Sequence, residues 1–198
     1  TLVIDSSKTD ESLGYAYVFT VLPKDWLNGR IVSIKWRGYF TYLGSRTLAT
    51  LNLFDGVLDR RDESSYFKPE QDSEGIFNLR NIELAKYDCG AIGWCNWRED
   101  KSDILNLSDW GDYVTLVIRF RDDWIQQLVI LQVSEIKILN PDGSVFKVLR
   151  FEGNPVMERT GTYNDYGYIG NCPNIGTPSV CSCGDACQHF TDIVQISA

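Results

Sequence analysis

The stretch Val114-Thr115-Leu116-Val117-Ile118-Arg119-Phe120 decides the fold, because large apolar side chains occupy every second position in it. A period of two places alternate side chains on one face of a β-strand, whereas a helix repeats every 3.6 residues. The sequence around this stretch has the same strand-like patterning, and no segment of about 12 residues shows a helical stripe. The other predicted strands are residues 2–4, 15–21, 31–36, 48–53, 128–139, 145–149 and 190–196.

A strong turn separates two of these strands. In Asn140-Pro141-Asp142-Gly143, proline presets the first corner and glycine takes the left-handed position. We therefore expect a β-hairpin at this point. About eight to ten strands at this spacing are typical of a sandwich. The predicted fold is all-β, a jelly-roll-like antiparallel β-sandwich with a disulfide-pinned C-terminal extension.

The sandwich is expected to occupy residues 1–153. Residues 154–198 form a cysteine-rich extension whose first part abounds in Tyr, Asn and Gly. Because this part has too few apolar residues to build a core alone, we expect it to pack on the same domain.

Composition and charge exclude some partners. The chain has 198 residues and a net charge of -8, and 43% of its residues are hydrophobic. An acidic surface does not suit nucleic acid, since phosphate binding requires Lys and Arg. The longest apolar runs fall far short of the roughly 20 residues that span a bilayer. We expect copies of the chain itself and glycans as partners, with no nucleic acid and no membrane span.

Six cysteines form two clusters. Cys89 and Cys95 enclose a short loop with two glycines, which favours a local disulfide. Two further bridges are expected among Cys172, Cys181, Cys183 and Cys187; Cys181 and Cys183 are too close to pair with each other. The alternative is a zinc site that includes His189. Disulfides indicate an extracellular or cell-surface location. The chain begins at Thr1 without an initiator methionine, which suggests a processed product or an excised fragment.

Residues 55–74 contain seven carboxylates and only three basic residues. Carboxylate and carbonyl oxygens are the ligands that Ca²⁺ prefers. The sequence therefore predicts a calcium site, and the alternative is a solvated charged loop. A second and weaker candidate is residues 109–112. The predicted calcium ligands are Asp55, Asp59, Asp62 and Glu63.

Several aromatic residues fall in predicted loops. Sugar rings present apolar C–H faces that stack on such side chains. The alternative is that these aromatic residues close the ends of the sandwich. The predicted ligand-binding residues are Trp94, Trp97, Tyr166 and Tyr168.

No nucleophile elbow, phosphate loop or zinc-protease motif is present. Glu135 with Asp122 or Asp123 is the one carboxylate pair considered for glycoside hydrolysis. We expect no enzymatic activity, with a glycoside-active enzyme as the second alternative.

Residues 29–139 resemble the jelly-roll sandwiches of extracellular carbohydrate-binding modules. The likeness lies in Leu51-Asn52-Leu53-Phe54-Asp55-Gly56 and in Trp110-Gly111-Asp112-Tyr113-Val114-Thr115-Leu116. It implies a structural Ca²⁺ held by Asp55, Asp59 and Asp62. The chain is similar, too, to secreted subunits that polymerise into filaments or tubules. The leading hypothesis is a non-catalytic extracellular structural or adhesive subunit that assembles by strand addition and Ca²⁺ bridging, and the alternative is a glycan-binding module.

Overall fold

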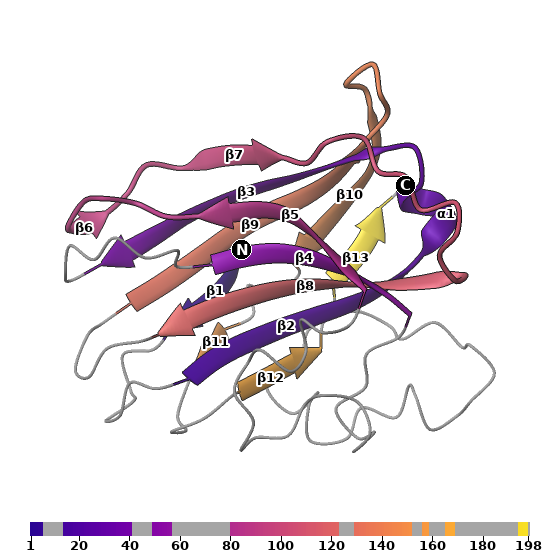
Figure 1. Cartoon of the computed structure of the whole chain (residues 1–198). Helices are drawn as coiled ribbons and strands as arrows, with labels where there is room; N and C mark the ends of the chain where they lie inside the picture. Colours follow the sequence, from indigo (N-terminus) through magenta and orange to yellow (C-terminus); the bar gives the residue numbers. More distant parts are fainter. Residues whose placement is uncertain are drawn as a thin grey trace.

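The computed structural model is a sandwich of two β-sheets packed face to face (Figure 1). It describes residues 1–5, 14–40, 49–56, 80–122, 129–151, 156–158, 165–168 and 194–197. Nearly all of the regular structure is β-strand, and the one described helix is α1 (Lys24–Leu27). The prediction of an all-β antiparallel sandwich is confirmed.

The larger sheet is built around β3 and β9, which pair antiparallel along their whole length. Beyond β3 lie the two short strands β6 and β7, and beyond β9 lie β1 and β10. The outermost strands β11 and β13 pair with β1 and β10. The bounds are β1 (Leu2–Asp5), β3 (Ile31–Phe40), β6 (Gly93–Trp94), β7 (Arg98–Lys101), β9 (Val129–Leu139), β10 (Val145–Phe151), β11 (Val156–Glu158) and β13 (Val194–Ser197).

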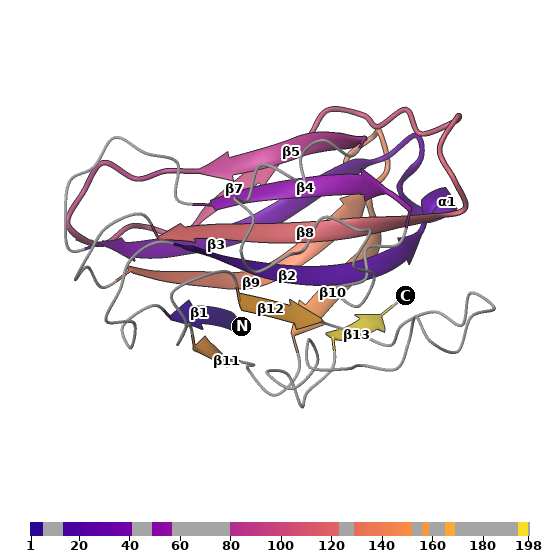
Figure 2. The same ribbon diagram turned by 60° about the horizontal axis from the view of Figure 1, so that its bottom comes forward.

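The second sheet has the order β12-β2-β8-β4-β5, and Figure 2 shows its strands in front of those of the larger sheet. Its middle strand, β8, contains the alternating stretch Val114–Phe120. Pairing is antiparallel except between β12 and β2 here and between β1 and β11 in the larger sheet. The bounds are β2 (Gly14–Pro23), β4 (Ala49–Asp55), β5 (Asn81–Tyr87), β8 (Tyr113–Asp122) and β12 (Asp165–Tyr168).

The core lies between the sheets and follows the period of two. Val114, Leu116, Ile118 and Phe120 of β8 all belong to it, and so does Trp36 of β3, which is fully buried. Burial of each such side chain contributes roughly 1.5–3 kcal/mol. Alternation on β3 then leaves the neighbours of Trp36 on the outer face of the larger sheet.

The opposite face of the second sheet is buried as well. Thr115 and Val117 of β8 and Phe54 of β4 are 0% exposed, and Tyr17 of β2 is 1% exposed. The sequence pattern indicated at least one buried face for these strands, and the structure buries both.

The predicted hairpin is confirmed. β9 and β10 pair antiparallel across the turn, and Gly143 donates its N–H to the carbonyl of Asn140 at 2.9 Å. Gly143 has a φ of 87°, the left-handed conformation that its position in the turn requires.

Three short strands come from the predicted extension, residues 154–198. β11, β12 and β13 each pair with a strand of the main body. The four cysteines of this region and His189 lie outside the described residues, so the predicted bridges and the zinc alternative stay predictions. Within the described parts of the chain, no helix is long and apolar enough to cross a membrane.

Candidate functional site

The Cys89–Cys95 disulfide is confirmed, and it closes a loop at one end of the larger sheet. The two Cα atoms are 6.6 Å apart, within the usual range for a disulfide. Inside this loop, Gly93 has a φ of 89°, which side-chain-bearing residues rarely adopt. Gly93 begins β6, so its backbone conformation and the disulfide together set the direction of the next residue, Trp94.

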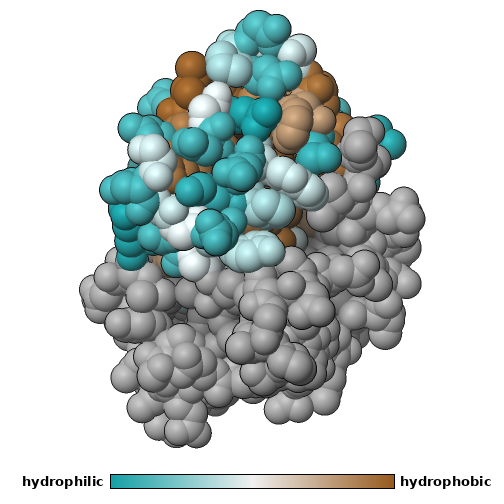
Figure 3. Space-filling model, turned by 90° about the vertical axis from the view of Figure 1, so that its right-hand side faces the viewer, coloured by the Kyte–Doolittle hydropathy of each residue, from teal (hydrophilic) through white to brown (hydrophobic). Residues whose placement is uncertain are grey.

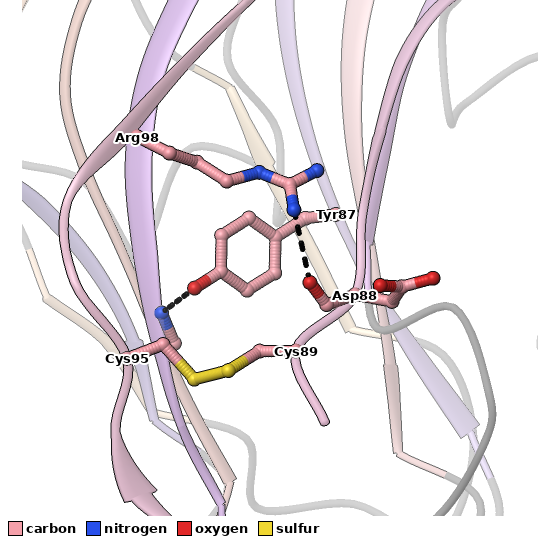
Figure 4. The surroundings of a disulfide bond; sticks show 6 residues. Tyr87, Asp88, Cys89, Cys95 and Arg98 are labelled. Carbon is pink, nitrogen blue, oxygen red and sulfur yellow. Dashed lines mark hydrogen bonds between the residues drawn. A yellow bond between two sulfur atoms is a disulfide. The ribbon is translucent and has the colours of Figure 1, made fainter. Parts of the chain in front are cut away.

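A buried tyrosine supports this loop from below. Tyr87 accepts a hydrogen bond on its hydroxyl from the N–H of Gly38 at 2.8 Å, and the carbonyl of Gly38 accepts from the N–H of Cys95 at 2.9 Å. Figure 4 shows Tyr87 beside the disulfide, with the side chain of Arg98 over its ring. Burial raises the pKa of Tyr87, so the hydroxyl stays neutral. The Gly38 backbone is therefore tied to both ends of the disulfide loop.

A second set of contacts fixes the chain after the loop. Asp100 accepts hydrogen bonds from Trp36 Nε1 at 2.6 Å and from Arg98 Nε at 2.8 Å. The other guanidinium nitrogens of Arg98 donate to the carbonyls of Asp88 and Lys86. β7 thus begins at a residue bound on several sides, which holds Trp97, the residue directly before it, close to the sheet.

Five side chains meet on the outer face of this end of the sheet, and we call them the Arg37 platform: Arg37, Tyr39, Trp94, Trp97 and Gln132. The guanidinium carbon of Arg37 lies 4.4 Å from the ring centroid of Trp94 and 4.8 Å from that of Trp97. Tyr39 meets Trp94 edge to face at 5.3 Å. Arg37 Nε donates to Gln132 Oε1 at 2.7 Å. Trp94 remains 43% exposed, so the platform presents aromatic surface to solvent.

A β-bulge brings Gln132 to the platform. β3 and β9 shift register between the Lys35–Glu135 and Trp36–Val133 pairs, which leaves Ser134 as an extra residue. The bulge lets β9 turn both Val133 and Ile136 into the core, although they are an odd number of positions apart. Gln132 consequently faces outward, in register with Arg37.

The structure brings together two of the four predicted ligand-binding residues. Trp94 and Trp97 share the Arg37 platform. Tyr166 and Tyr168 lie on β12, which belongs to the other sheet. The sequence did not predict Arg37, Tyr39 and Gln132 as site residues, because strand residues with partly exposed side chains carry no motif. The only signal for Arg37 and Tyr39 was their period-two spacing opposite Trp36.

The predicted calcium ligand Asp55 lies at the other end of the sandwich, where β4 ends. We call its surroundings the Arg80 corner: Asp55, Arg80, Asp109, Trp110 and Gly111. Asp55 Oδ1 accepts the N–H of Gly111 at 2.9 Å, and Asp55 Oδ2 is 3.8 Å from Arg80 Nη1. Arg80 Nη2 binds Asp109 at 2.6 Å, and this hydrogen bond holds the pKa of Asp109 below its usual range. Figure 3 looks onto this end, where hydrophilic residues cover most of the described surface.

Asp59, Asp62 and Glu63, the other predicted calcium ligands, lie outside the described residues. The described residues include no group of three or more His, Cys, Asp or Glu side chains suited to a metal ion. Asp55 and, from the second predicted segment 109–112, Asp109 both pair with Arg80, and two carboxylates fall short of the six to eight oxygens that Ca²⁺ requires. The calcium site stays a prediction.

The carboxylates considered for glycoside hydrolysis do not share a sheet. Glu135 is on β9 and binds Lys137 Nζ at 2.8 Å, a hydrogen bond that raises the pKa of Lys137. Asp122 is the last residue of β8, in the second sheet, and Asp123 lies outside the described residues.

A small apolar cavity of about 20 Å³ lies between the sheets, lined by residues of β2, β8, β9 and β10. That volume is close to the room one water molecule occupies and is far below that of a sugar ring. A sugar-sized ligand would therefore require the outer surface.

Comparison of the chain with protein-family models, with curated proteins and with solved structures found no match. Function is therefore inferred from the chemistry of the site, since a sandwich fold by itself hosts many functions.

Proposed function

We propose that this chain is a non-catalytic extracellular module that binds glycans on the Arg37 platform and serves in adhesion. One observation carries the proposal: Trp94 and Trp97 both lie against Arg37 on the outer face of a sheet, and Trp94 is 43% exposed. Sugars offer apolar C–H faces for the aromatic rings and hydroxyl groups for the guanidinium and amide.

Rigidity supports the same proposal. A binding surface that is already ordered loses little conformational entropy when the ligand arrives. Trp94 follows Gly93 within the disulfide loop, and Trp97 precedes the anchored residue Arg98. Arg37 itself is held by Gln132. These constraints favour a platform that keeps its shape without ligand.

The disulfide is compatible with an extracellular location, where such bonds persist. Self-assembly by strand addition has less structural support. Leu2 and Ile4 of β1 are fully buried, and β1 pairs with β9 and β11 of its own chain. Strand donation to a neighbour would require β1 to leave this sheet. Sedimentation in Ca²⁺ and then in EDTA tests assembly and calcium together; particles that dissolve in chelator would support both predictions.

A glycan array with matched variants tests the proposal. We expect the wild-type chain to bind and Trp97→Ala to bind about tenfold more weakly, a loss of roughly 1.4 kcal/mol. Trp94→Ala should behave similarly. The matched control is Trp26→Ala, because Trp26 lies on α1 at the opposite end and contacts Lys147. An array without any bound glycan, or a Trp97→Ala variant that binds as well as wild type, would count decisively against the proposal.

A further inference from the structure

We propose that the Arg37 platform selects glycans that carry a carboxylate, such as those with a uronic or sialic acid residue. The carboxylate is bound by the Nη groups of Arg37, and the sugar ring stacks on the neighbouring indole surface. This inference rests on the proposed function, because it names the class of sugar that the same site takes.

The positive charge of Arg37 is available to an anionic ligand. Within the described residues, its guanidinium has two aromatic contacts and one hydrogen bond, to the neutral amide of Gln132. No carboxylate among the described residues pairs with Arg37. Arg80 and Arg98 differ, since Arg80 pairs with Asp55 and Asp109 and Arg98 pairs with Asp100. Arg37 thus carries a positive charge that an anionic ligand can neutralise.

The remaining hydrogen-bond donors of Arg37 are the N–H groups on its two Nη atoms. A guanidinium has five N–H groups in its plane, and aromatic rings pack against its faces. Nε is occupied by Gln132, and no described residue accepts a hydrogen bond from the four Nη hydrogens, so these can bind a ligand. Two parallel N–H groups on one edge match the spacing of the two oxygens in a carboxylate.

The hydrogen bond from Arg37 fixes the orientation of the Gln132 side-chain amide. Because Arg37 Nε can only donate, the atom it meets must be the amide oxygen of Gln132. The amide nitrogen of Gln132 then has its own N–H groups to donate. The platform therefore presents hydrogen-bond donors from two residues. A carboxylate, which only accepts hydrogen bonds, matches these donors.

The acidic residues near Arg37 have partners of their own. Glu99, in register with Lys35, accepts a hydrogen bond from Ser33 and interacts with Lys137, and Glu135, on β9, is bound by Lys137. Asp5 lies on the same face but pairs with Ile130, one strand beyond β9 from Arg37 and two residues along the sheet. Two strand spacings of about 4.8 Å and two residue spacings of about 3.3 Å separate the Cα atoms of Asp5 and Arg37 by roughly 12 Å, more than the Debye length of about 8 Å at physiological salt. The net charge of -8 therefore does not prevent a carboxylate from binding at Arg37.

Calorimetry with paired probes tests the inference. The first pair is trigalacturonic acid and its methyl ester, and the second is sialyllactose and lactose. We expect the acidic member of at least one pair to bind at least tenfold more tightly. Arg37→Gln should remove this preference while leaving weak binding of the neutral member. Arg37→Lys, which keeps the charge but loses the paired N–H geometry, should lower the preference several-fold.

The matched control for charge is Lys147→Gln, which removes one positive charge at the α1 end, where Lys147 lies near Trp26. It should leave the preference unchanged. Equal affinity for the acidic and neutral members of both pairs would overturn this inference while the proposed function survives. A preference that persists in Arg37→Gln would overturn it as well. If the chain binds none of these probes and no glycan on an array, both the proposed function and this inference are wrong.

Discussion

The two ends of the sandwich each place an arginine against a tryptophan, with opposite results. Arg80 lies over Trp110 with its guanidinium carbon 5.3 Å from the ring centroid, and Asp55 and Asp109 pair with it. Arg37 lies against Trp94 and Trp97, and its hydrogen-bond partner is an amide. Among the described residues, the same pair of residue types thus forms a neutralised ion pair at one end and, at the other, a surface whose arginine keeps N–H donors without a protein acceptor.

The carboxylates make the difference. In the Arg80 corner they come from the end of β4 and from the loop before β8, so the arginine ties separate segments of the chain together. At the Arg37 platform, the hydrogen bonds that hold the chain in place run beneath the surface, through Tyr87 and Asp100. Structural support and exposed chemistry are therefore separated there, as a binding site requires.

The largest effect that separates the two ends should come from the disulfide. Cys89→Ser with Cys95→Ser removes a cross-link whose partners are six positions apart in sequence. Chain entropy then predicts a loss of about 2 kcal/mol in the free energy of unfolding. Glycan binding should fall as well, because Trp94 lies in the released loop. Urea denaturation and calorimetry measure the two effects.

The Arg80 corner provides the comparison for that experiment. Asp109 in the double variant should keep the lowered pKa that Arg80 imposes, since the corner lies at the opposite end. Binding that survives loss of the disulfide undiminished would show that Trp94 does not depend on the loop.

Tyr87→Phe tests the buried support beneath the platform. The substitution keeps the ring under Arg98 but leaves the buried N–H of Gly38 without an acceptor. An unpaired buried donor costs about 1–2 kcal/mol. We expect that decrease in unfolding free energy by urea denaturation, with a smaller decrease in glycan affinity. Tyr39→Phe is the control, because the Tyr39 ring contact with Trp94 needs no hydroxyl. Equal stability of Tyr87→Phe and wild type would contradict the role of this hydrogen bond.

The sequence predicted most of the long strands, because their periodicity comes from one physical cause, burial of one face. It did not predict β5, whose buried positions do not alternate, or the short strands β6, β7, β11 and β12. It predicted the 89–95 disulfide because two glycines allow the short loop a tight path. It did not predict that Val117 and Thr115 would be buried on the second face of β8, since alternation describes only the face that is more apolar. That extra burial depends on tertiary packing.

The binding platform was predictable only in part. Trp94 and Trp97 stand out as loop aromatics near a disulfide. Gln132 could not be assigned to their surface, because its outward direction depends on the bulge at Ser134. A strand without that bulge would place Gln132 on the other face of the sheet. Nothing in the local sequence indicates that Ser134 is the extra residue of a bulge.

Asp55→Asn sharpens the interpretation of the Arg80 corner. The amide keeps an acceptor for the N–H of Gly111 but loses the charge that faces Arg80. Because Asp55 is partly exposed, solvent screening limits the loss of unfolding free energy to about 0.5–1 kcal/mol. Asp112→Asn, an exposed neighbour, should have no measurable effect. A stabilised Asp55→Asn variant would instead indicate unrelieved repulsion among the carboxylates there, the situation that a bound cation would relieve.

The smallest effect should be seen at Asp109, whose pKa is lowered chiefly by the hydrogen bond from Arg80. A carboxyl whose pKa is lower in the folded state stabilises the fold above its unfolded pKa, and that contribution disappears as pH falls through the folded pKa. Arg80→Gln should raise the pKa of Asp109 toward the ordinary value of 3.8, measured by NMR titration of the carboxyl group. Arg37→Gln should leave the pKa of Asp109 unchanged, because no carboxylate of the described chain pairs with Arg37. A shift of this pKa in Arg37→Gln would show that the two ends are electrostatically coupled. The contrast between Arg80, which carboxylates neutralise, and Arg37, which no described carboxylate neutralises, would then be wrong.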